Sequence, residues 1–191
     1  MENATSGDHS AIAAMGGNTM QFILAITAFA LLLSPGPRQD KPAEKPTQNN
    51  DQHSHDVDTR GDHVMGFSHE KATHHFRLYP DGGAIEITTN DPQDTATRDE
   101  IRRHLGHILG MFAAGNFRAP MLIHAIDSPG AATMKQLRSE IAYKFENLDH
   151  GGRVTIVTHN PEALESVHKF LRFQIKDHKT GDGLEVVSGQ K

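Results

Sequence analysis

The stretch Asp81-Gly-Gly-Ala-Ile-Glu-Ile-Thr-Thr-Asn-Asp-Pro92 aligns without gaps on His150-Gly-Gly-Arg-Val-Thr-Ile-Val-Thr-His-Asn-Pro161, 69 residues further along the chain. In both copies a Gly-Gly pair stands between two runs in which every second side chain is apolar. Glycine tolerates the positive φ angles of hairpin turns, and such alternation is typical of strands with one buried face. The sequence therefore predicts two β-hairpins, each centred on its Gly-Gly pair.

A helical pattern follows each predicted hairpin. The first helix is expected from about Thr97 to Ala114, with Thr97 or Asp94 as its N-cap. The second is expected to begin at Pro161, with Asn160 as its N-cap, and to end near Lys179. In both, apolar residues recur at helical spacing on one side, so each helix has one face to bury.

These elements predict an α+β fold built from a duplicated β-β-α unit. One unit alone leaves its apolar sheet face exposed, whereas two units together form an antiparallel sheet of four strands with two helices on one face. The apolar run Met121–His124 is a candidate fifth, short strand. We expect the duplicated domain to span residues 63–182, followed by a flexible tail over 183–191.

The N-terminal third has a different composition. Residues 21–33 are almost entirely apolar and too few for a spanning helix, which needs roughly 20 residues. Residues 1–37 are therefore expected to be a signal peptide or a membrane anchor, with translation starting at Met1 or Met20. Residues 38–62 are predicted to be a disordered tether. The expected location is periplasmic, or membrane-tethered facing the periplasm.

The composition excludes several classes of function. The 191 residues include no Cys, which excludes disulfides, thiolate catalysis and iron–sulfur clusters. The formal charge of −5 gives no general attraction to nucleic acid, so no nucleic-acid partner is expected. Histidine is over-represented, with 14 residues.

Some of these histidines have spacing that suits a metal. His104 and His107 lie three apart on the first helix, with Met111 one turn further, so their side chains share one flank. Strand alternation turns His74 toward the helices, and His69 is close enough in sequence to add a ligand. Imidazole and thioether ligands suit copper, above all Cu(I). We therefore predict a copper site from these five residues, whereas His168 and His178 are interpreted as structural.

Two other functions stay open. No nucleophile elbow, P-loop or zinc-protease motif occurs in the chain. The leading hypothesis is an exported, non-catalytic binding protein for a transition metal. The first alternative is a protein- or peptide-interaction module that uses the polar sheet face and the 125–133 loop. The second alternative is a small enzyme with a histidine general base.

The domain also resembles a family of small, uncharacterised exported bacterial proteins. The likeness is carried by segments over 65–76, 81–83, 111–115, 119–124 and 170–182. Some members of that family carry the name aspartate carbamoyltransferase. The chain lacks the Ser-Thr-Arg-Thr-type phosphate loop of that enzyme's catalytic chain and the four cysteines of its regulatory chain, so the name is not transferred.

Overall fold

The computed structural model describes residues 47–188, and the signal or anchor expected over 1–37 lies outside them. The regular elements of the described part are α1 (Thr47–Met65), a short 3-10 turn (His69–Lys71), β1 (Ala72–Tyr79), β2 (Gly82–Thr89), α2 (Thr95–Ala113), α3 (Arg118–His124), α4 (Ala131–Gln136), a second 3-10 turn (Arg138–Glu140), β3 (Ile141–Leu148), β4 (Gly151–Thr158) and α5 (Pro161–Asp177). No helix among them is long and apolar enough to cross a membrane.

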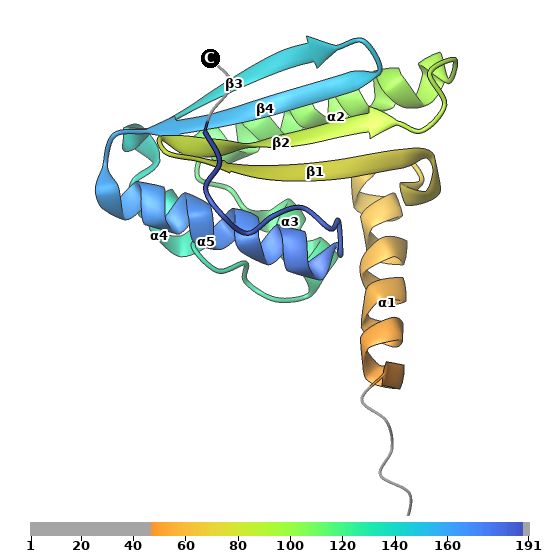
Figure 1. The fold of residues 1–191 in the computed structure, drawn as a ribbon, viewed down its shortest axis with the longest axis horizontal. Helices are drawn as coiled ribbons and strands as arrows, with labels where there is room; N and C mark the ends of the chain where they lie inside the picture. The colour runs from red at the N-terminus through yellow and green to blue at the C-terminus, as the bar shows by residue number, and fades with distance from the viewer. Residues whose placement is uncertain (1–46, 189–191) are drawn as a thin grey trace, which may run out of the picture. The chain divides into compact units, whose positions relative to one another are not determined.

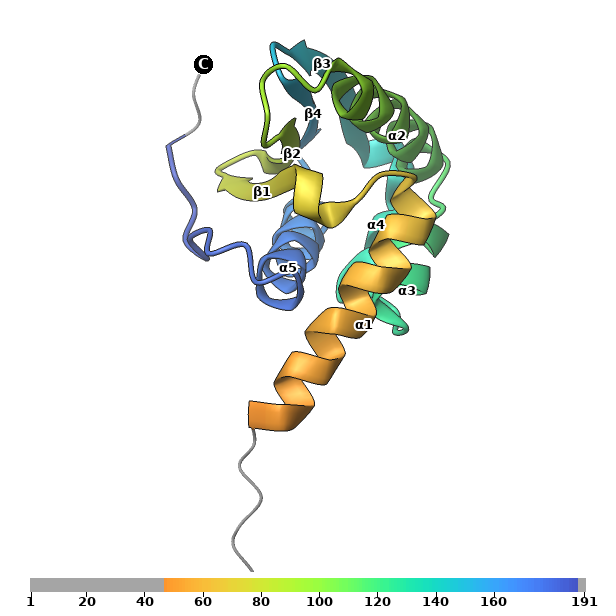
Figure 2. The ribbon, with the colours of Figure 1, turned by 90° about the vertical axis from the view of Figure 1, so that its right-hand side faces the viewer.

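The four strands form one antiparallel sheet in the order β1-β2-β4-β3. Figures 1 and 2 show α2 and α5 on the same side of this sheet. The α+β class and the four-stranded antiparallel sheet are thus confirmed. The order β-β-α occurs twice, but that one unit duplicates the other stays a prediction.

Glycine allows the two hairpins to approach each other at the centre of the sheet. A Cβ atom on Gly82 would lie 1.9 Å from the Ile156 carbonyl oxygen, and one on Gly151 would lie 1.9 Å from the Ile87 carbonyl oxygen. Both distances are far below van der Waals contact, so neither position accepts a side chain without separating β2 from β4. The Gly-Gly pairs therefore permit the β2–β4 pairing. The hairpins were expected to be centred on these pairs, but the turns lie just before them, at residues 80–81 and 149–150, and the glycines begin β2 and β4.

Side-chain caps set the beginnings of the two long helices. Asp94 accepts a hydrogen bond from the Thr97 backbone N–H, which selects Asp94 over Thr97 as the N-cap of α2. Asn160 accepts hydrogen bonds from the backbone N–H groups of Glu162 and Ala163 at the start of α5. The apolar faces of both helices pack on the sheet, and the core is a single cluster.

The expected fifth strand is wrong, because residues 118–124 form the helix α3. The buried side chains of this segment are Ala119, Pro120, Ile123 and His124, a spacing that fits one face of a helix and not the alternation of a strand. Pro120 lies in the first turn, where its missing N–H costs no intrahelical hydrogen bond.

The tether prediction is also wrong over 47–62, where the chain forms most of α1. The segment has few apolar residues, but Val57 and Met65 are buried, with 1% and 8% of their surface exposed. Figure 2 shows α1 running alongside α3. The segment therefore obtains from the domain the apolar contacts that it lacks within itself.

The beginning of the predicted tail is bound to the sheet. Val187 donates a backbone hydrogen bond to the Leu78 carbonyl, and Val186 pairs with Leu78 in a parallel bridge at the edge of β1. Asp182 accepts hydrogen bonds from the Phe76 backbone N–H at 3.0 Å and from the Thr180 hydroxyl at 2.7 Å. Residues 183–188 thus cover one edge of the sheet rather than extending freely.

Candidate functional site

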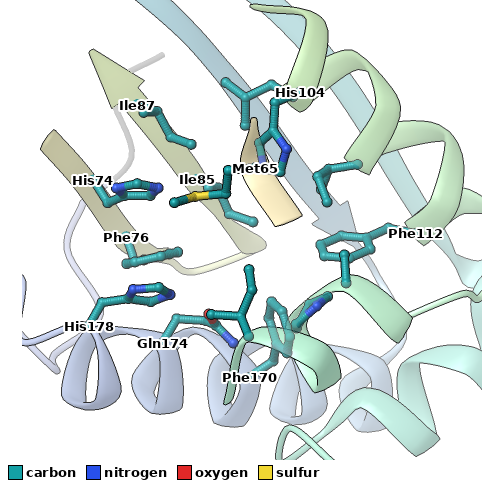
Figure 3. Close-up of a pocket in the computed structure, with 15 residues that line it drawn as sticks. Met65, His74, Phe76, Ile85, Ile87, His104, Phe112, Phe170, Gln174 and His178 are labelled. Carbon is teal, nitrogen blue, oxygen red and sulfur yellow. The ribbon is translucent and has the colours of Figure 1, made fainter. Parts of the chain in front are cut away.

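Three histidines and one methionine line a small cavity between the sheet and the helices. His74 extends from β1 on the same face as Phe76, His104 comes from α2, His178 caps the end of α5, and Met65 ends α1. Figure 3 shows the Met65 thioether beside the His74 ring. Apolar residues of the sheet, α2, α3 and α5 form most of the remaining wall. The enclosed space is about 50 Å³, enough for an ion or a few waters and far below the roughly 300 Å³ of small organic ligand sites.

The imidazole rings pack against one another and against phenylalanines. The ring centroids of His74 and His178 are 5.5 Å apart, and the planes are nearly parallel, at 4°. Phe76 stacks beside both rings, at 6.3 Å from His74 and 5.7 Å from His178. Phe67 stacks on His74 at 6.2 Å and meets His104 edge-on at 5.7 Å. The histidines therefore occupy an apolar, aromatic environment.

This environment keeps the three imidazoles neutral. Burial, followed by repulsion from the nearby imidazoles of His104, His75 and His69, lowers the pKa of His74 to about 4. Burial, followed by repulsion from His107, lowers the pKa of His104 to about 4. These two rings are therefore uncharged at pH 7 and keep a nitrogen lone pair.

The pKa of His178 is lowered most, to about 3. Burial is the main cause, repulsion from His74 and His124 adds to it, and the Asp177 carboxylate opposes it. Among the hydrogen bonds between described residues, none involves the ring nitrogens of His74, His104 or His178. The lone pairs of the neutral rings are thus not committed to that network.

A wider cleft adjoins the cavity on its α1 side. It has a volume of about 300 Å³ and shares Met65, His74 and His178 with the cavity. His69 also lines the cleft, and its Nδ1 atom lies 2.9 Å from Oδ1 of Asp62. The side chains shared by both spaces, Met65, His74 and His178, lie between the apolar cavity and a more polar cleft.

A buried polar group supports the α5 side of the cavity. His124 is 1% exposed, and its Nδ1 atom lies 2.5 Å from Oδ2 of Asp177. Its Nε2 atom lies 2.9 Å from Oε1 of Gln174, while Nε2 of Gln174 has no hydrogen-bond partner among the described residues.

The structure brings only part of the predicted metal set together. His74 and His104 line the cavity and His69 lines the adjoining cleft, whereas His107 is exposed and Met111 packs against the core outside the cavity lining. No three His, Asp or Glu side chains among residues 47–188 are placed around one point as metal ligands would be. Of the three residues predicted to form a metal-binding flank on α2, His104, His107 and Met111, only His104 therefore lines the cavity.

Two cavity residues were missed by the sequence analysis, His178 and Met65. His178 continues the apolar positions Leu171 and Ile175 of α5 at helical spacing, and that periodicity was the available signal. Met65 had no comparable signal, because its helix was not predicted. His168, by contrast, is structural as expected, with Nε2 lying 2.9 Å from the Tyr79 carbonyl oxygen and 3.0 Å from that of Gly82.

A second hollow lies on the surface between the end of α2 and α4. It has a volume of about 700 Å³ and is lined by residues 114–118, by Met121 and by residues 127–133 and 135. Leu122 and Ile126, which are 43% and 53% exposed, lie on the same stretch of chain. This hollow includes much of the loop that was expected to bind a protein partner.

Comparisons of the chain with protein-family models, with curated proteins and with solved structures give no match. The function is therefore argued from the site alone.

Proposed function

We propose that the domain binds a soft transition-metal ion, Cu(I), in the cavity, through His74, His104, His178 and Met65. This ligand set keeps two of the residues expected from the sequence and replaces the exposed His107 and the core residue Met111. The observation that supports the proposal most directly is the presence of three neutral imidazoles and a thioether around one small cavity.

The chemistry of the side chains favours this ion over harder ones. Imidazole and thioether ligands suit Cu(I), whereas calcium and magnesium prefer oxygen ligands. A metal ligand must be unprotonated, and the lowered pKa values of the three histidines mean that no proton has to leave them at neutral pH. The rings do not converge on one point as placed, so binding includes ring rotations within the cavity.

In this proposal the protein is an exported, non-catalytic binding protein. The apolar run Gln21–Leu33 supports export, and no nucleophile elbow, P-loop or zinc-protease motif occurs in the sequence. A bound Cu(I) ion would be its cargo, held among aromatic rings that limit access of water. A separate secretion test, with detection of the chain in the periplasmic fraction, would check the location independently of metal binding.

The proposal is tested by titrating the full chain, purified without a His tag, with Cu(I) against a chromophoric Cu(I) chelator. The wild-type chain is expected to take up one equivalent, and His74→Ala together with His178→Ala is expected to abolish that uptake. His107→Ala, on the same helix as His104 but exposed, is the matched control and is expected to bind normally. No stoichiometric uptake by the wild type, or full uptake by the double variant, would refute the proposal.

A second function is supported by the hollow beside α3 and α4. The exposed side chains Leu122 and Ile126 and the large hollow fit an interaction module that accepts apolar side chains of a peptide. In that case Ile126→Asp would abolish binding of a purified partner, and metal chelators would not affect binding. Dependence of partner binding on Cu(I) would favour the metal function instead.

A further inference from the structure

Helix α1 separates the proposed metal site from solvent on one side. Val57, Gly61 and Met65 follow one another at four-residue spacing and are the buried residues of this helix. All three line the outer cleft, and Met65 also lines the cavity. Moving α1 away from the domain would therefore remove one wall of the cavity and expose His74 and His178.

Polar contacts hold α1 against the rest of the domain. Near the end of the helix, the Asp62 carboxylate accepts a hydrogen bond from the His69 backbone N–H at 2.6 Å and lies 2.9 Å from the His69 Nδ1 atom. The Arg60 Nε–H donates to the Ile123 carbonyl at 2.7 Å, and the His53 Nε2 atom lies 2.9 Å from the Asp177 carboxylate. The His53 side chain is 48% exposed, so water competes with that contact. Over residues 51–65 the buried residues of α1 are two apolar side chains and Gly61, with Val64 partly buried against the core, compared with five buried residues on α2.

The helix itself has little intrinsic stability. Its sequence is rich in Asn, Asp, His and Thr and includes Gly61, residue types that disfavour a helix interior. An isolated helix of 19 residues with such a composition is marginal in water. The order of α1 therefore depends on its docking.

A hinge follows directly after Met65. Gly66 has a φ angle of +83°, which glycine adopts without the strain that other residues incur, so this position tolerates a wide range of backbone angles. The next residue, Phe67, is 5% exposed and is fixed against His74 and His104. Motion at Gly66 would thus move α1 while Phe67 stays in place, and it would require the contacts between Asp62 and His69 to break or shift.

We propose that α1 is a lid that Cu(I) closes, because Met65 supplies the thioether ligand from the lid itself. This inference rests on the proposed metal function. An ion bound to His74, His178 and Met65 holds the last turn of α1 against the domain. By linkage, the free energy by which the ion stabilises the docked helix equals the free energy by which docking strengthens ion binding. Zn(II), which prefers nitrogen and oxygen to thioether ligands, can bind the imidazoles without closing α1.

The proposal is tested by amide hydrogen exchange with mass spectrometry on the full chain, with and without one equivalent of Cu(I). Exchange over α1 is expected to slow at least tenfold when Cu(I) binds. Met65→Leu keeps a side chain of similar volume but removes the sulfur, so it is expected to lose this protection. Met111→Leu is the matched control, because Met111 packs outside the cavity, and it is expected to keep the protection.

The outcomes separate the lid from the metal site. If the chelator titration shows stoichiometric Cu(I) but α1 exchange is unchanged, the lid is refuted and the metal function stands. If Cu(I) protects α1 equally in Met65→Leu, closure does not depend on the thioether and the proposal is wrong. If the wild-type chain binds no Cu(I), both proposals fail. Equal protection of α1 by Zn(II) would also contradict the thioether coupling.

Discussion

Lowering the pH is expected to destabilise the domain through its three cavity histidines. In the folded chain the pKa of His74 and of His104 is about 4 and that of His178 is about 3, against an ordinary value of 6.5. The unfolded chain therefore binds more protons than the folded chain between about pH 6.5 and pH 4. The free energy of unfolding is greatest above pH 6.5 and decreases as the pH falls through that range.

The magnitude follows from the same values. Between pH 7.5 and pH 5 each of these histidines should remove about 2 kcal/mol from the free energy of unfolding. The three together should remove on the order of 6 kcal/mol, against a total of about 5–15 kcal/mol for a typical domain. Asp94, Asp177 and Asp182 also have lowered pKa values, but from an ordinary value of 3.8, so they contribute at lower pH.

The assay is urea unfolding of the metal-free chain at half-unit steps from pH 7.5 to pH 5, followed by circular dichroism. The slope of the free energy of unfolding against pH is expected to correspond to an uptake of nearly three protons near pH 5.5. His178→Phe should reduce that uptake by about one proton. Met111→Leu, which changes no titratable group and lies outside the cavity lining, should leave it unchanged. An uptake below one proton, or an unchanged slope in His178→Phe, would refute the assignment of these rings as buried and neutral.

Three further substitutions test the fold. Gly151→Ala places a methyl group against the Ile87 carbonyl oxygen and should lower the free energy of unfolding by about 3 kcal/mol or more, measured by urea unfolding. Gly110→Ala, in the exposed interior of α2 with no atom within 4 Å of the new Cβ, should raise it by up to about 1 kcal/mol; a loss there would contradict the packing of α2. Asn160→Ala should lower it by about 1 kcal/mol through the lost N-cap of α5, and an unchanged midpoint would argue against that cap.

The parts of the fold that could be predicted are those determined by local chemistry. Alternating apolar residues on either side of each Gly-Gly pair predicted the two hairpins, whose strands are β1 to β4, although the turns lie just before the glycines. Asn160 before Pro161 gave the start of α5 correctly, and both long helices were placed within about two residues of their true ends. Each of these features depends on residues close together in the sequence, so no knowledge of tertiary packing was needed.

The parts that were missed depend on tertiary contacts. Residues 118–124 form too short an apolar run to separate a strand from a buried helix by periodicity. The helix α1 is polar and becomes ordered through contacts with α3, which the local sequence pattern does not predict. For the same reason the sequence did not assign Met65 to the site. Metal binding was predicted for His104, His107 and Met111, but only His104 lines the cavity.

The cavity histidines are most simply explained by function, because they are unfavourable for stability alone. A neutral imidazole that is half-buried among apolar side chains loses part of the hydration that it has in the unfolded chain, and its cost rises as the pH falls. Phenylalanine or leucine at positions 74, 104 and 178 would fill the same aromatic environment without that cost and without a pH dependence. The surrounding core already uses such residues, since Phe76, Phe112 and Phe170 are each at most 3% exposed. Ser128 and Tyr143 also have buried hydroxyls without a hydrogen-bond partner among the described residues, so such groups are not confined to the cavity. The cavity differs in its chemistry: it gathers three neutral imidazoles and a thioether, and these are groups that bind a soft cation.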